Sequence, residues 1–129
     1  MTERLNIPSG AVWEDQVGYS RAVRIGNTIE VSGTVSVKDG KIYGPRDPYE
    51  QAKRILEIIE NTLIKAGARL DDIIRTRMYV TDIKQWEAVG KAHGEVFGNI
   101  KPATSMVEVK GLIDQEFMVE IEATAIVMD

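Results

Sequence analysis

The alternation of residues 117–127 constrains the fold of this chain more than any other feature. In this run, FMVEIEATAIV, every second residue is apolar, whereas Glu120 and Glu122 fall at the other positions. Because successive side chains of a β-strand point to opposite faces, the run predicts a strand with one fully apolar face. The two carboxylates either face water or line a subunit interface or cleft, and the strand alone leaves both interpretations open.

Length and charge bound the class of protein. With 129 residues, 43% of them hydrophobic, the chain has the size of a single domain with one core, and we expect one domain over residues 1–129. The net charge of −4 argues against nucleic acid as a partner. No run has the length of a membrane span or of a signal peptide, so we expect no membrane partner and a cytoplasmic location.

The inventory of reactive side chains narrows the chemistry. The chain has no cysteine and one histidine. Thiolate nucleophiles, disulfides and thiolate metal sites are therefore excluded, and a zinc site built on histidines is disfavoured. We expect no metal.

The first third of the chain reads as β-structure after an irregular N-terminal stretch. Strands are predicted at Ser20 to Ile25 and at Thr28 to Ser36, joined by a hairpin turn at Gly26-Asn27. A further short strand is expected at Ile42-Tyr43. Gly33, inside the second strand, marks either a β-bulge or a place where a ligand or a neighbouring backbone approaches closely.

Capping signals mark two helices. The first begins with Asp47 as the N-cap and Pro48 at the first helical position, and Gly67 ends it. The second begins after Asp82, with a glutamine three residues later that predicts a capping box, and it ends near Phe97.

Three more strands complete the chain, at Ile73 to Thr81, Thr104 to Lys110 and Phe117 to Met128. The order β-β-(β)-α-β-α-β-β predicts an α+β domain in which a strand that follows a helix returns to the sheet. The apolar side of the second helix includes Ile83 and Trp86, and His93 borders this packed face. It is either a structural histidine with its hydrogen bonds satisfied or a catalytic group.

Short motifs are spread over nearly the whole chain. In chain order they are Gly18-Tyr19-Ser20, Val31-Ser32-Gly33, Gln51-Ala52, Ala66-Gly67 with Asp71-Asp72, Tyr79-Val80-Thr81-Asp82, Pro102-Ala103 and Val119-Glu120-Ile121-Glu122-Ala123. Their order and spacing resemble those of the Rid family, also called YjgF-like proteins, reactive-intermediate deaminases or the endoribonuclease L-PSP type.

The resemblance implies a chorismate-mutase-like α+β fold, with a six-stranded mixed sheet backed by two helices. It also implies a homotrimer with the sheets inward and with clefts for a small-molecule ligand between adjacent subunits. Active deaminases of the family hydrolyse enamine and imine intermediates to keto acids and ammonia without a metal or an organic cofactor. Within a trimer, Glu120 is expected to face the cleft, and Glu122 is expected to be paired at the interface.

The resemblance also implies which residues line the cleft. Tyr19, Ser32, Gly33 and Glu120 match the family pattern. Glu120 is the candidate for ordering a water molecule, because a carboxylate accepts hydrogen bonds from water.

Several cleft positions depart from the family pattern together. The arginine that follows Pro-Ala in active members is Thr104 here, and the cysteine two residues later is Met106. On the second helix Gly90 replaces an asparagine and His93 a tyrosine, while Arg21 replaces the glutamine that follows Tyr-Ser. The guanidinium fork that suits a substrate carboxylate is therefore missing from its usual place.

Two functions remain open on the sequence. One is a Rid-like enzyme in which Glu120 positions water and Arg21 or Arg77 replaces the lost arginine. The other is a non-catalytic trimer that binds or senses a metabolite, which the neutral Thr104 and Met106 favour. Ribonuclease activity, suggested by the older family name, fits poorly because an acidic chain lacks the positive charge that phosphate binding needs.

Overall fold

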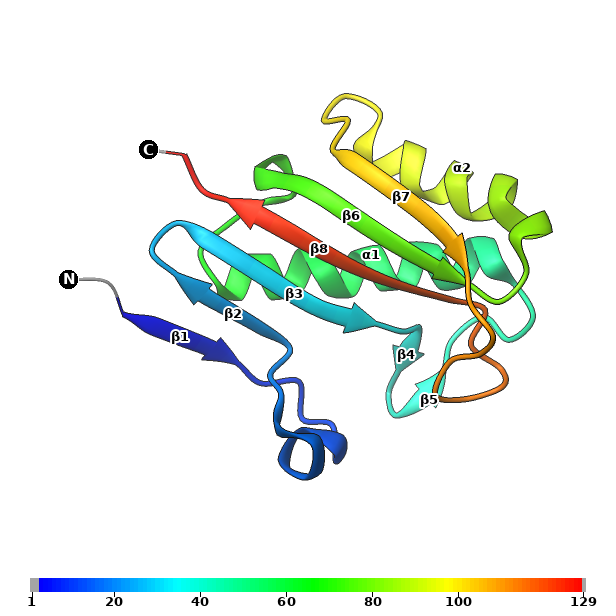
Figure 1. Cartoon of the computed structure of the whole chain (residues 1–129), viewed down its shortest axis with the longest axis horizontal. Helices are drawn as coiled ribbons and strands as arrows, with labels where there is room; N and C mark the ends of the chain where they lie inside the picture. The colour runs from blue at the N-terminus through cyan, green and yellow to red at the C-terminus, as the bar shows by residue number, and fades with distance from the viewer. Residues whose placement is uncertain (1–2, 129) are drawn as a thin grey trace.

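The alternating run near the C-terminus forms the centre of the sheet. In the computed structural model, which describes residues 3–128, strand β8 (Val119–Ile126) lies between β3 (Thr28–Thr34) and β6 (Ile73–Val80) (Figure 1). Val119, Ile121, Ala123 and Ala125 are buried on one face, whereas Glu120 and Glu122 are half-buried on the other face, which also carries the exposed Ile126. The strand thus has the single apolar face that its sequence predicts.

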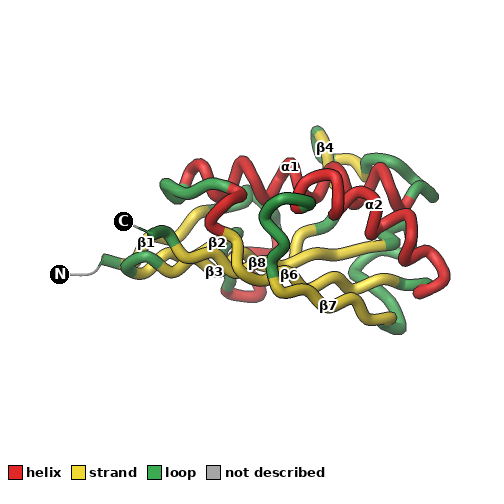
Figure 2. Tube along the Cα trace, turned by 90° about the horizontal axis from the view of Figure 1, so that it is seen from above, coloured by secondary structure: helices red, strands yellow, loops and turns green. Residues whose placement is uncertain are grey.

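Six strands form one mixed sheet in the order β1-β2-β3-β8-β6-β7. The strands not yet introduced are β1 (Arg4–Ile7), β2 (Ala22–Ile25) and β7 (Ala103–Glu108). Only β6 and β7 pair in parallel, and every other pair is antiparallel. Both helices cover the same face of the sheet (Figure 2). We call the opposite face the open face; it carries Arg21, Val23, Glu30, Ser32, Arg75, Arg77, Tyr79, Glu120 and Glu122.

The sixth strand comes from the N-terminal stretch, which we had expected to be irregular. Arg4–Ile7 pairs with β2, but only Ile7 is buried, so β1 has no alternating apolar signal in its sequence. The segment at Ile42 joins no sheet strand: β5 (Lys41–Ile42) pairs with β4 (Val37–Lys38) in a separate two-stranded ribbon. The hairpin at Gly26-Asn27 is confirmed, since Ile25 and Thr28 are paired across it.

Helix α1 (Pro48–Lys65) matches its sequence signals. The Asp47 side chain accepts a hydrogen bond from the Glu50 amide at 3.0 Å, and Pro48 occupies the first turn. One face of the helix packs on the sheet through Ile55, Leu56, Ile59 and Leu63, each at most 2% exposed. Gly67 follows the helix with φ of 82°, a backbone conformation that suits glycine.

Helix α2 (Trp86–Phe97) begins later than its sequence predicts. A 3₁₀ turn, Ile83–Gln85, precedes it, and Asp82 caps that turn by accepting from the Lys84 amide at 3.0 Å. The predicted capping box is therefore absent. Ile83 and Trp86, expected on the packed side, are exposed, whereas Val89, Ala92 and Phe97 form the buried face.

Two irregularities in the strands re-aim side chains. The register between β3 and β8 shifts between Val31 and Thr34, which is the β-bulge that Gly33 suggested. A second shift in β6, between Ile73 and Arg75, turns Ile74 outward, although strict alternation along the strand would place it on the same face as the buried Thr76.

Within residues 3–128 no helix is long and apolar enough to cross a membrane.

Candidate functional site

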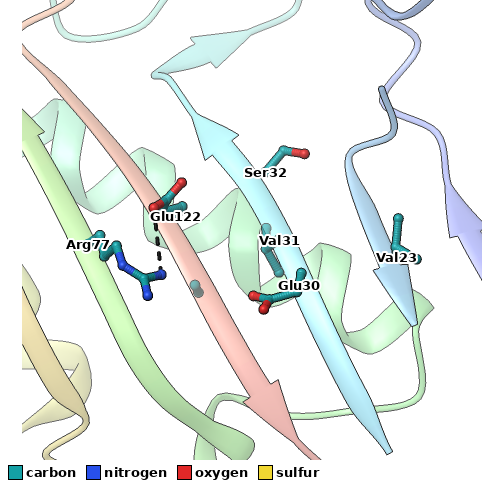
Figure 3. Close-up of a pocket in the computed structure, with 7 residues that line it drawn as sticks. Val23, Glu30, Val31, Ser32, Arg77 and Glu122 are labelled. Atoms are coloured by element: carbon teal, nitrogen blue, oxygen red, sulfur yellow. Dashed lines mark ion pairs between the residues drawn. The ribbon is translucent and has the colours of Figure 1, made fainter. Parts of the chain in front are cut away.

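Glu120 and Glu122 share the open face but have different surroundings. Glu122 accepts a hydrogen bond from the Tyr79 hydroxyl at 2.7 Å, and it pairs with Arg77 at 3.7 Å (Figure 3). Among residues 3–128, no side chain or amide donates a hydrogen bond to Glu120 in the structure, and no cation pairs with it. Burial, followed by the charge of Glu122, raises the pKa of Glu120, and Arg21 opposes this. Glu120 is thus the carboxylate that remains available to water or a ligand.

Gly33 provides the space that the Glu120 side chain occupies. A Cβ atom built on Gly33 would lie 2.8 Å from Oε2 of Glu120 and 2.9 Å from its Cδ. The bulge interpretation of Gly33 is confirmed by the register shift, whereas the atoms of residues 3–128 closest to a Cβ at this position belong to the Glu120 side chain and not to a neighbouring backbone. The approaching group is a side chain of the same chain.

Arg21 lies on the other side of Gly33. Its Nη1 donates to Thr34 Oγ1 at 2.5 Å and contacts the carbonyl oxygens of Ser32 and Gly33 at 3.4 and 3.3 Å. Burial lowers the pKa of Arg21. The nearby Tyr19, Glu14 and Glu120 oppose this effect and raise the pKa. The bulge therefore positions the guanidinium as well as the carboxylate.

The remaining predicted residues of this part of the sheet are close by. Ser32 donates its hydroxyl to the Ser20 carbonyl at 2.6 Å, and its amide donates to the Arg21 carbonyl at 2.9 Å. Tyr19 follows a π-helical turn (Glu14–Gly18) and leads into β2. We call Tyr19, Arg21, Ser32, Gly33 and Glu120 the glutamate group.

Thr104, His93 and Met106 lie on the helix-covered side of the sheet. Thr76, which is fully buried, has its Oγ1 2.8 Å from Thr104 Oγ1 and 2.9 Å from His93 Nε2. The His93 ring also packs on Phe97 at 4.6 Å between centroids, and burial lowers the pKa of His93. These surroundings favour the neutral form of His93 and give its Nε2 a hydrogen-bond partner.

We call Thr76, His93, Thr104 and Met106 the threonine group. Met106 packs against the core, and Thr104 lies on β7, the last strand of the sheet. The glutamate group lies on β2, β3 and β8, so one chain does not bring the two groups together. The side chains of the two groups, which the resemblance predicts in one cleft, are therefore split between two places in the fold.

Neither cation that the sequence offered as a replacement lies beside Thr104. Arg77 is paired with Glu122 on the open face, and Arg21 is bound to the bulge of β3. A third cation, which the sequence interpretation did not single out, contacts the strand of Thr104: Arg75 donates from Nη2 to the hydroxyl of Ser105 at 2.8 Å, and its Nε is buried without a partner among residues 3–128. Arg75 could have been found from the sequence, because the alternation of β6 places it on the same face as Arg77.

A shallow hollow of about 260 Å³ lies on the open face (Figure 3). Its lining residues come from β2, β3, β6 and β8; they are Val23, Glu30, Val31, Ser32, Arg77, Glu122 and Ala123. Ser32 is shared with the glutamate group. No cluster of three or more histidine or carboxylate side chains in residues 3–128 could hold a metal ion.

Comparisons with known proteins agree on one family. Residues 13–127 match the family model described as Endoribonuclease L-PSP. An uncharacterized protein of Streptomyces coelicolor is 35% identical over 119 residues, which cover 92% of this chain and 89% of that protein. A RutC family protein of Pyrococcus abyssi is 36% identical over 109 residues, covering 83% and 84% of the two chains.

Solved structures give the same result for the fold. Rv2704 from Mycobacterium tuberculosis, described as a member of the YjgF/YER057c/UK114 family, superposes with a TM-score of 0.88 at 48% identity and covers 97% of this chain and 100% of its own. The YjgF gene product of E. coli superposes with a TM-score of 0.80 at 29% identity, covering 94% and 93% of the two chains.

Proposed function

The chain belongs to the endoribonuclease L-PSP family of Rid and YjgF-like proteins, and from this premise we propose that it binds a small metabolite in clefts between the subunits of a homotrimer. The observation that carries the proposal is the split between the glutamate group and the threonine group. A neighbouring subunit that brings its β7 edge to the open face would join the two groups into one cleft.

The open face has the composition of a surface that is covered in an assembly. Ile25, Val107 and Ile126 are 48%, 46% and 38% exposed there. Ile25 and Ile126 flank Thr28 in the pairing of β2, β3 and β8, and apolar side chains that gather on an exposed face are typical of an interaction surface. The charges between these residues are already partly neutralised by the pair of Arg77 and Glu122.

Assembly and binding can be tested separately. Light scattering after gel filtration is expected to give about three times the 14.4 kDa of the chain, and a monomer at micromolar concentration would contradict the proposal. A thermal-shift screen against keto acids, amino acids, aromatic acids and heterocycles is expected to find a ligand that raises the melting temperature, because a ligand that binds the native state stabilises it. A trimer with no stabilising ligand would leave an interaction role.

A second candidate function, hydrolysis of enamines or imines, is favoured by the surroundings of Glu120. A half-buried carboxylate with a raised pKa and no donor among residues 3–128 can accept a proton from water as the water adds to an imine carbon. Glu120 returns this proton to the nitrogen, which gives a carbinolamine. The proton of the new hydroxyl group is then transferred to the nitrogen as the C–N bond breaks, so that ammonia leaves and a ketone or keto acid remains.

Hydrolysis is tested with 2-aminoacrylate or 2-iminobutanoate generated enzymatically in the assay. The protein is expected to accelerate keto-acid formation, and Glu120→Gln is expected to abolish the acceleration. No acceleration by the wild type would refute hydrolysis of these compounds and leave ligand binding in place. RNA cleavage is not part of the proposal, because a chain of net charge −4 offers little attraction for phosphates.

A further inference from the structure

Arg21 is fixed in place but has no anionic partner among residues 3–128. The three acceptors of its Nη1 are uncharged oxygens of β3, the Thr34 hydroxyl and two carbonyl groups. No carboxylate in residues 3–128 pairs with Arg21, whereas Arg54, Arg69 and Arg77 each have one. The Nε and Nη2 of Arg21 have no acceptor in this part of the chain, and neither is sealed from solvent. One edge of the fork is therefore held and the other is free to bind.

The surroundings of this arginine favour an added anion. Burial lowers its pKa, so the charged guanidinium has lost part of its hydration. Hydrogen bonds to neutral oxygens replace only some of that loss, and a carboxylate on the free edge would replace more through two parallel N–H bonds. Because the bulge already orients the group, little side-chain entropy remains to be lost on binding.

The other cations of the open face are less suited. Arg77 is neutralised by Glu122. Arg75 lies opposite Thr124, whereas Glu120 lies opposite Tyr79 on the same strand. These positions are four residues apart, which is about 13 Å along a strand. Arg21, in contrast, shares Gly33 with Glu120 as a neighbour.

We infer that Arg21 is the residue that binds a carboxylate group of the ligand, and that the ligand is a small carboxylate whose adjoining carbon lies toward Glu120. The inference rests on the proposed cleft and specifies its chemistry. The sequence differs from the family pattern in two positions that fit this inference: it has an arginine at Arg21, where the family has a glutamine, and it lacks the family arginine at Thr104. The anion anchor has thus moved from the β7 strand to the segment that precedes β2, beside Glu120.

The test compares an acid with its neutral amide. The probes are 2-oxobutanoate and 2-oxobutanamide, titrated into the full chain by calorimetry at fixed ionic strength. Wild-type protein is expected to bind the acid more tightly. Arg21→Gln is expected to weaken acid binding by about tenfold to a hundredfold, as for loss of a charged hydrogen bond, and to leave amide binding unchanged. Arg75→Gln, which removes the same charge from the same face, is expected to keep acid binding within about threefold of the wild type.

The Arg21→Lys variant keeps the positive charge but not the guanidinium hydrogen bonds to the bulge. It therefore distinguishes the effect of the charge from the effect of those hydrogen bonds. It is expected to retain a preference for the acid over the amide, and it serves as the test if the Gln variant does not fold. Equal loss of acid and amide binding in Arg21→Gln, with a normal melting temperature, would overturn the inference. Acid binding that depends on Arg75 would overturn it as well. If wild type binds neither probe while the thermal-shift screen finds an uncharged ligand, the inference fails and the proposed cleft stands.

Discussion

Replacing Gly33 by alanine tests whether the bulge of β3 is present to accommodate Glu120. The new methyl carbon would lie 2.8 Å from Oε2, 2.9 Å from Cδ and 3.3 Å from Cγ of that side chain. Carbon atoms in good contact are about 3.5–4.0 Å apart, so the Glu120 side chain must move by roughly 1 Å or rotate away. Gly33 does not have a positive φ, and the backbone accepts alanine without strain. The clash is therefore the main native-state effect of the change.

The expected magnitude follows from two opposing effects. Overpacking a well-filled site costs about 1–3 kcal/mol, and the lower part of this range applies because Glu120 is half-buried and its end can rotate outward. A glycine-to-alanine change also stabilises by about 0.4–1 kcal/mol through the unfolded chain. With Glu120 present, we expect a net loss of about 1 kcal/mol. With Glu120→Ala, the clash is gone and the same change is expected to stabilise by about 0.5 kcal/mol.

The assay is a double-mutant cycle by urea denaturation at one protein concentration. The four proteins are the wild type, Gly33→Ala, Glu120→Ala and the double variant, and the expected coupling is about 1–2 kcal/mol. Gly111→Ala is the control, because a Cβ there meets no atom within 4 Å and its φ is not positive. An equal effect of Gly33→Ala in both backgrounds would refute the reasoning, since it would place the cost in the backbone.

Two further changes test the electrostatics and the buried polar contacts. Because the folded pKa of Glu120 is raised, the folded state binds its proton more readily than the unfolded state, and this contribution to stability is lost as pH rises through the folded pKa. Glu120→Gln is therefore expected to gain stability over the wild type progressively from about pH 4 upward in urea titrations, and a difference that does not change with pH would contradict this. Gln51→Leu is expected to destabilise by roughly 3 kcal/mol, because the fully buried amide of Gln51 bonds the Gly44 and Glu116 carbonyls and the Met118 amide, which would all lose their partner. A loss below about 1 kcal/mol would show that water replaces those bonds.

The elements that the sequence predicts well are those with a strong local signal. The alternation around Glu120 and the cap at Asp47 each depend on a few neighbouring residues, and both are confirmed in β8 and α1. Strand β1 has no such signal, because its backbone pairing with β2 needs only one buried side chain, Ile7. The outward turn of Ile74 likewise depends on a register shift against β8, which no pattern within β6 records.

The sequence named the candidate site residues one by one, but it did not give their arrangement. The motifs identified Tyr19, Ser32, Gly33 and Glu120, and the structure brings these around one bulge. Thr104 and His93 were expected in the same cleft, whereas in one chain they lie on the other face of the sheet and bond through Thr76. The sequence of one chain does not indicate which of its surfaces contacts a second copy. The split between the two groups could therefore not be predicted from it.

The split site also gives the most direct test of the proposed cleft. Because the chain has no cysteine, Glu120→Cys and Thr104→Cys each introduce a single thiol. The two variants are unfolded together, refolded as a mixture, and treated with a bismaleimide cross-linker of about 10 Å reach, which is roughly two interstrand spacings. Any covalent dimer between the two variants then joins residue 120 of one subunit to residue 104 of another.

A cleft between subunits predicts a cross-linked dimer in the refolded mixture and little in either variant alone. Mass spectrometry of the digested dimer is expected to identify the peptides that contain positions 120 and 104. A mixture that refolds to the native mass by light scattering yet gives no such cross-link would contradict the central claim, because the glutamate and threonine groups would then not meet.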